Sequence, residues 1–172
     1  DNWRMPGSWN VPIDELAAII DNAVDNGYTV AWGGDVSGGG FTRDGIALLI
    51  DEEASADLTG SDMAHWLKLT PAERQNKIKE LGVTVKEAAP SQEKRQEEFD
   101  EWTLTDDHGM LIFGKATDQT GREYYMVKNS WGDASGYKGI WYMSKNYIIQ
   151  NTMDFMVNKN AVPAEIRKKL GI

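Results

Sequence analysis

The sequence contains no cysteine among its 172 residues, which excludes disulfide bonds and thiolate metal sites within this chain. Long apolar stretches are missing too. Uninterrupted apolar runs such as residues 46–50 are far shorter than the roughly 20 residues that cross a bilayer. No basic segment followed by an apolar one opens the chain. We therefore expect no membrane partner, and these absences leave the cellular compartment unknown.

Positive charge is also scarce, because 18 Lys and Arg residues face 27 Asp and Glu residues, giving a net charge of −9. An acidic surface repels phosphate backbones, so we expect no nucleic-acid partner. Histidine occurs only twice, as His65 and His108. The many carboxylates show no metal-ligand spacing around either histidine, so the sequence predicts no metal ion and no cofactor. His65 lies in a polar segment and is interpreted as a surface or locally packed side chain.

The first half of the sequence predicts helices, one strand and a polar excursion. Residues 12–26 have a helical apolar period, with Pro12 at the first helical position and Gly27 at the stop. Residues 28–35 predict a strand with Val30 and Trp32 on one face. Residues 51–90 lose this alternation and contain a proline-led capping box at 70–73, so they are interpreted as a helical surface insertion. A charged helix is expected after Pro90.

The second half of the sequence predicts mainly strands. Residues 108–116 and 122–130 alternate around the turn sequence DQTG, which indicates a β-hairpin. Two further strands are expected at 139–144 and 151–158, and a helix at 163–170. This order predicts an α+β fold with an antiparallel sheet or half-open barrel. The length suits one domain or one lobe of a larger fold, so residues 1–172 are treated as a single unit.

His108 and Asn129 are the most informative pair in the sequence. His108 begins the first hairpin strand and Asn129 lies at the end of the second, so the hairpin is expected to bring their side chains within hydrogen-bond reach. The amide oxygen would then fix the imidazole tautomer and leave the other ring nitrogen free to act as a base. Trp131, two residues further on, is expected to exclude water from this bond.

Two other interpretations of His108 remain open from spacing alone. One is a structural histidine without a catalytic role. The other is a zinc hydrolase in which His108 acts with Asp106 and Asp107, although catalytic zinc usually needs three protein ligands and adjacent strand residues point to opposite faces.

Several segments of the sequence resemble papain-like cysteine peptidases. The segment DDHGMLIFG, followed by YYMVKNSWGDASGYKGIWYMS, is similar to the histidine and asparagine segments of that family. The segments VDNGYTVAWGGDVS, SQEKRQEEFDEWTLTDDHGM and NKNAVPAEIRKKLGI resemble its bleomycin hydrolase and aminopeptidase C branch. The resemblance extends from about residue 15 to the end of the chain. It implies a papain-like fold, represented here mainly by the β-sheet lobe.

The resemblance assigns roles to individual residues. His108 would pair with a cysteine thiolate and later protonate the leaving amine, and Asn129 would orient its ring. Trp131 would shield their hydrogen bond and border the leaving-group side. Asp107 and Gly109 would border the bound peptide, with the backbone carbonyl of Asp107 holding substrate. The side chains of Asp106 and Asp107 are expected either to favour the imidazolium or to be solvated turn residues.

The nucleophile and the oxyanion-hole glutamine of the family have no match in this sequence. Papain-type cysteines lie roughly 130–150 residues before the histidine, whereas only 107 residues precede His108. We therefore expect a C-terminal part whose partner is a preceding, cysteine-bearing part. The resemblance further implies peptide substrates, aminopeptidase activity, a hexameric homo-oligomer and a cytoplasmic location, with an extracytoplasmic one left open. A non-catalytic lobe that binds peptides or protein partners is the alternative.

Overall fold

The fold was analysed in a computed structural model of the 172-residue chain, which describes residues 7–38, 40–51, 86–133 and 136–172. Its elements run α1 (Ile13–Asp25), β1 (Val30–Gly34), β2 (Ile46–Ala47), α4 (Gln92–Asp100), β3 (His108–Thr117), β4 (Glu123–Lys128), β5 (Ile140–Ser144), α5 (Lys145–Asn151), β6 (Thr152–Val157), a 3-10 turn (Lys159–Ala161) and α6 (Ala164–Leu170). The predicted α+β class is confirmed. The insertion predicted at 51–90, with its helix and His65, lies almost entirely outside the described residues.

Six strands form one sheet in the order β2-β5-β4-β3-β1-β6. Neighbouring strands are antiparallel, as predicted, except the short β2 and its neighbour β5, which are parallel. The predicted hairpin is β3–β4, in which Thr117 pairs with Glu123 across the turn. A register shift between Ile112 and Gly114 accommodates one extra residue, Phe113, so that residues 111–117 of β3 pair with the six residues of β4.

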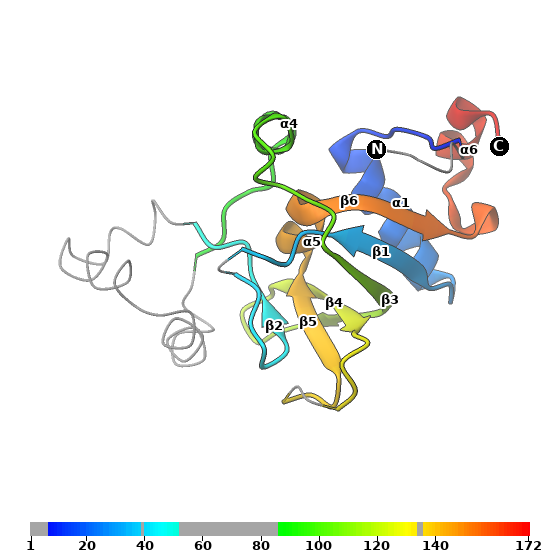
Figure 1. Cartoon of the computed structure of the whole chain (residues 1–172). Helices are drawn as coiled ribbons and strands as arrows, with labels where there is room; N and C mark the ends of the chain where they lie inside the picture. The colour runs from blue at the N-terminus through cyan, green and yellow to red at the C-terminus, as the bar shows by residue number, and fades with distance from the viewer. Residues whose placement is uncertain (1–6, 39, 52–85, 134–135) are drawn as a thin grey trace.

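The helices α1 and α5 lie against the sheet, as Figure 1 shows, and α6 lies next to α1 beyond β6. Period-2 alternation places one face of β1 and β3 in the core, so Val30, Trp32 and Ile112 are buried as that pattern predicts. The other face of β3 carries exposed Leu111 and Phe113. The largest core cluster joins sheet and helix residues, among them Leu16, Ile20, Ala23, Val127, Trp141, Met143, Tyr147 and Ile148.

The helix α4 is attached to this body by polar contacts, because it has no buried residue of its own. Ser91 caps its start by accepting a hydrogen bond from the backbone N–H of Lys94 at 3.2 Å. The Arg95 guanidinium donates to the carbonyls of Ile149, Gln150 and Thr152 at 2.6–2.9 Å. These contacts hold α4, and the segment that leads from it to β3, against the end of α5.

The structure describes no helix that is long and apolar enough to cross a membrane. This finding concerns only the described ranges of the chain.

Candidate active site

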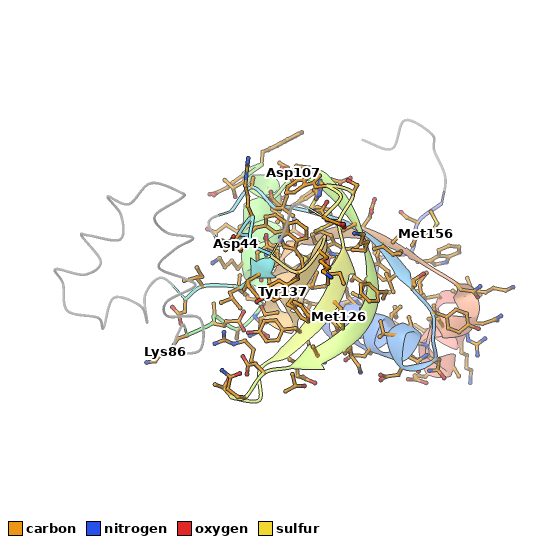
Figure 2. The ribbon with its side chains drawn as sticks, turned by 90° about the horizontal axis from the view of Figure 1, so that it is seen from below. Asp44, Lys86, Asp107, Met126, Tyr137 and Met156 are labelled. Carbon is orange, nitrogen blue, oxygen red and sulfur yellow. The ribbon has the colours of Figure 1, made fainter. Side chains whose placement is uncertain are left out.

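The hairpin brings His108 and Asn129 together at one end of the sheet. His108 is the first residue of β3 and pairs with Gly34 of β1, while Asn129 directly follows β4. The ring Nε2 of His108 lies 2.9 Å from Oδ1 of Asn129. Asp107, the neighbour of His108, marks this end of the sheet in Figure 2, well away from Met126 within β4.

The hydrogen-bond pattern fixes which ring nitrogen carries the proton. The Asn129 oxygen also accepts a 2.7 Å hydrogen bond from the backbone N–H of Ser130, which identifies it as the amide oxygen. An amide oxygen only accepts, so Nε2 of His108 must donate to it. The neutral ring then has Nδ1 unprotonated, and Nδ1 is the atom that can take a proton from a nucleophile.

Burial makes the Asn129 contact a stable anchor. Asn129 is only 2% exposed, and its Nδ2 has no hydrogen-bond partner among the residues that the structure describes. Its backbone N–H donates to the carbonyl of Gly139 at 3.1 Å, which fixes the residue after β4 ends. The side chain can therefore hold the His108 ring without competition from bulk water.

The indole of Trp131 lies beside the His108 ring. Their centroids are 4.9 Å apart with a tilt of 43°. Trp131 contacts Phe41 and Trp141 edge-on, with centroids at 6.1 and 5.6 Å, and these rings support it from behind. Trp131 covers one side of the imidazole while it remains 43% exposed itself.

Asp107 and Gly109 flank His108 on the side of β1. The Asp107 backbone N–H donates to the carbonyl of Gly34 at 3.3 Å, and its Oδ1 accepts from the backbone N–H of Val36 at 3.0 Å. Its side chain is therefore held by the loop after β1, although the residue is exposed to solvent. Gly109 pairs with Gly33 and is exposed, and a Cβ on it would meet the carbonyl oxygen of Trp32 at 4.0 Å, an ordinary contact distance.

Asp106 and Asp154 form an acidic pair near His108. Their Oδ1 atoms both approach the position that a Cβ on Gly33 would occupy, so the glycine leaves room for them. Partial burial, followed by the carboxylates of Asp154 and Asp107, raises the pKa of Asp106 above its ordinary value.

The raised pKa predicts how Asp106→Asn changes stability with pH. The folded chain holds the Asp106 proton more tightly than the unfolded chain, so its free energy of unfolding falls as pH rises through this pKa. The variant is therefore expected to be more stable than the parent near neutral pH, and this advantage should vanish by about pH 3. Urea unfolding at several pH values measures it. An Asp154→Asn background should reduce the effect, and a pH-independent difference would contradict the prediction.

The zinc interpretation of His108, Asp106 and Asp107 finds no support in the geometry. Within the described ranges, no group of three histidine, aspartate or glutamate side chains is placed to hold a metal ion.

Sequence reasoning missed a buried carboxylate next to this site. Asp35 directly follows β1, is 4% exposed, and accepts hydrogen bonds from Ser37 and Thr105. The only feature of the sequence that marks Asp35 is its position as the last residue of the predicted strand 28–35. Nothing in the pattern connects it with a residue 70 positions further along the chain.

Comparison with known proteins identifies the family. The model of the Peptidase C1-like family matches residues 79–171. Aminopeptidase W of Lactobacillus delbrueckii subsp. lactis is 41% identical over 59 residues, which are 34% of this chain and 14% of that protein. The mitochondrial cysteine proteinase 1 of Saccharomyces cerevisiae is 33% identical over 82 residues, which are 46% of this chain and 17% of that protein.

A solved structure shows the same fold. PepW from Lactobacillus rhamnosis HN001 superimposes with a TM-score of 0.58 at 20% sequence identity, covering 94% of this chain and 30% of PepW. This chain thus corresponds to less than a third of that structure, and its matches span 14–17% of the two curated relatives.

The resemblance to papain-like cysteine peptidases that the sequence predicted is confirmed, as is the papain-like fold, and an aminopeptidase among the relatives agrees with the predicted branch. The chain belongs to the Peptidase C1-like family.

Proposed function

We propose that this chain is the C-terminal part of a cysteine aminopeptidase of the bleomycin hydrolase and aminopeptidase C type. Residues 1–172 would form one part of the peptidase domain and supply the histidine and asparagine of a Cys-His-Asn mechanism. The cysteine would come from a preceding part of the same protein, because these 172 residues contain none. The observation that carries the proposal is the 2.9 Å contact between His108 Nε2 and Asn129 Oδ1, with Trp131 beside it.

The orientation of the His108 ring, with Nε2 toward Asn129, fits the first half of such a reaction. Nδ1 of His108 would take the proton of the cysteine thiol, and the resulting thiolate would attack the carbonyl carbon of the scissile peptide bond. The imidazolium formed on His108 would then give its Nδ1 proton to the leaving amine as the carbon–nitrogen bond breaks. The hydrogen bond from Nε2–H to Asn129 would persist through both transfers and keep the ring in place.

The second half of the reaction regenerates the site. The same Nδ1 would take a proton from a water molecule as the water attacks the thioester carbonyl. The carbon–sulfur bond would then break, releasing the acid product and a thiolate, and the Nδ1 proton would return to the sulfur. Gly109, next to the base, is exposed and lacks a side chain, so an extended peptide can pass close to the backbone there. The Asp107 side chain is bound to Val36, which fixes the backbone whose carbonyl would face that peptide.

The test uses the complete protein, in which this chain is joined to its preceding part, and the 172-residue chain alone. The complete protein is expected to hydrolyse peptides with a free amino terminus, and alkylation of its thiols should abolish this activity. The chain alone should hydrolyse none. Peptides with a blocked amino terminus are the matched control that separates aminopeptidase from endopeptidase activity. Hydrolysis that survives complete alkylation would refute a cysteine mechanism.

The absence of cysteine also favours a second function, a papain-like lobe that binds peptides or a protein partner without cleaving them. A serine, glycine or alanine at the nucleophile position of the complete protein, together with peptide binding but no turnover, would establish it. A homo-oligomer, hexameric in the proposed branch, is part of the main proposal, and the mass of the complete protein in solution tests it.

A further inference from the structure

Two segments beside His108 are held together by several hydrogen bonds. One is the end of β1 with the loop that follows it, residues 34–37, and the other is segment 105–107, which leads into β3. The Asp107 backbone bonds Gly34, and its side chain bonds Val36. A third link comes from the carboxylate of Asp35, which reaches Thr105. The backbone just before His108 is thus fixed from the side of β1.

Each oxygen of the Asp35 carboxylate serves a different segment. Oδ1 accepts from the backbone N–H and the hydroxyl of Ser37 at 2.9 and 2.6 Å. Oδ2 accepts from the backbone N–H and the hydroxyl of Thr105 at 2.8 and 3.2 Å. We call these three residues, Asp35, Ser37 and Thr105, the Asp35 bridge. All four donors point at a group that only accepts, so the bridge requires an ionised carboxylate.

The environment of Asp35 keeps it ionised. Burial alone would raise the pKa of this carboxyl, but its hydrogen bonds with Ser37 and Thr105 outweigh burial and hold the pKa below its ordinary value. The backbone of Asp35 is fixed as well, because its N–H donates to the carbonyl of Asn151 and its carbonyl accepts from the hydroxyl of the buried Tyr147, both at 3.0 Å. The bridge therefore joins the segment before His108 to α5.

We propose that Asp35 is a positioning residue for His108, acting through the Asp35 bridge on the segment that carries the base. This inference rests on the proposed function of His108. The ring is held at its tip by Asn129 and through its backbone by β1, and the chain before it runs from α4 through the buried Leu104 to Thr105, where the Asp35 bridge holds it. Without the bridge, the segment from Thr105 to Asp107 gains freedom and the angle between ring and amide relaxes. A shift of about 1 Å in a catalytic group can cost on the order of 10²-fold in rate.

The Asp35→Asn variant tests the proposal at nearly constant volume. The new amide has one oxygen and one nitrogen, so in either orientation one segment faces a group that cannot accept its donors. In the complete protein, kcat is expected to fall about 10- to 100-fold. KM should change by less than about threefold, because substrate contacts are untouched.

A second readout does not depend on activity. In the 172-residue chain, the Nε2 proton of His108 lies in the hydrogen bond to Asn129, and NMR can follow its exchange with water. We expect Asp35→Asn to speed this exchange by about tenfold or more through local opening. If the complete protein cleaves no peptide, the proposed function fails, while the exchange comparison still tests whether Asp35 positions the ring.

Glu87→Gln is the matched control. Glu87 is also a buried carboxylate that accepts a backbone hydrogen bond, from Leu49 at 2.8 Å, but it is bound to β5 through Ser144 and not to the segment before His108. It should leave both kcat and the exchange of the His108 proton unchanged. Equal effects of Asp35→Asn and Glu87→Gln on these two readouts would overturn the proposal, and so would no effect of Asp35→Asn on either.

Milder variants keep the test decisive if Asp35→Asn does not fold. Thr105→Ala weakens the bridge on the side of His108, whereas Ser37→Ala weakens it on the other side and leaves the Thr105 bonds in place. The proposal expects faster exchange of the His108 proton and a lower kcat in Thr105→Ala than in Ser37→Ala. Indistinguishable variants would overturn it.

Discussion

His108→Ala is expected to reduce kcat of the complete protein by roughly 10⁴-fold or more, because no other group in the described part of the chain can take its place as base. The variant should still fold, since the ring is only half-buried and the core cluster that contains Ile112 and Val127 does not include it. Steady-state kinetics with a free amino-terminal peptide measures the loss. Unchanged peptide binding with no turnover is the expected signature.

Asn129→Ala is expected to have a smaller effect, a loss of about 10²-fold in kcat, on the scale of a misplaced catalytic group. The ring loses its acceptor for Nε2–H but keeps the contact with Trp131, whose centroid lies 4.9 Å away. Asn146→Ala is a suitable control, because it removes a single bond to the carbonyl of Ala88, far along the chain from His108. Equal residual rates for the His108 and Asn129 variants would contradict the roles of base and orienting group.

The hairpin was predictable because its signals are local. Alternating apolar residues on both sides of the DQTG turn specify two antiparallel strands, and this pattern alone places His108 and Asn129 at one end. The register shift between Ile112 and Gly114 was not predictable, although it determines how the two ends align. The extra residue is Phe113, and the next residue, Gly114, pairs with Met126, whose sulfur would lie 3.1 Å from a Cβ added there.

Short elements without a full period escaped prediction. The helix α5 has seven residues and follows directly on β5, with Ser144 both ending the strand and capping the helix. The strand β2 has only two residues and owes its existence to its partner β5. In both cases packing against the sheet stabilises an element that is too short to show a full helical or strand period. The hydrophobic pattern of the sequence therefore does not predict it.

Long-range polar contacts were equally hidden. The Asp35 bridge joins residues 70 positions apart, and Arg95 reaches carbonyls more than 50 positions away. Such contacts depend on where the folded chain places a carbonyl or a carboxylate, and no local sequence pattern predicts that position. The same contacts hold the segment before His108. The sequence therefore predicted the residues of the site but not the hydrogen bonds that hold the chain around them.

The Arg122–Glu87 ion pair is the long-range contact whose loss should cost the most stability. Arg122 Nε lies 3.3 Å from Glu87 Oε2, and the two side chains are only 15% and 8% exposed. Glu87 also accepts from the backbone of Leu49 and from the hydroxyl of Ser144. Arg122→Ala leaves this carboxylate buried without its cation, so the free energy of unfolding is expected to fall by about 3–5 kcal/mol. Urea unfolding measures it.

The pH dependence identifies the cause of that loss. Burial is the main reason that the pKa of Glu87 lies above its ordinary value, and removing Arg122 should raise it further. Because the folded chain then binds the Glu87 proton more tightly than the unfolded chain, the deficit of Arg122→Ala should shrink as pH falls through this pKa. Adding Glu87→Gln should recover part of the stability at neutral pH, since the amide removes the unpaired charge and keeps an acceptor for Leu49.

An exposed ion pair is the control that distinguishes the effect of burying a charge from the effect of losing an ion pair. Lys94 and Glu98 lie 3.8 Å apart on α4 with 56% and 28% of their side chains exposed, so Lys94→Ala should cost only about 0–0.5 kcal/mol. If Lys94→Ala and Arg122→Ala lowered the free energy of unfolding by the same small amount, the Glu87 carboxylate would have to be hydrated in the folded chain. A large loss confined to Arg122→Ala would instead show that this ion pair, together with the Ser144 hydrogen bond, fastens the chain at residue 87 to the start of β4 and the end of β5.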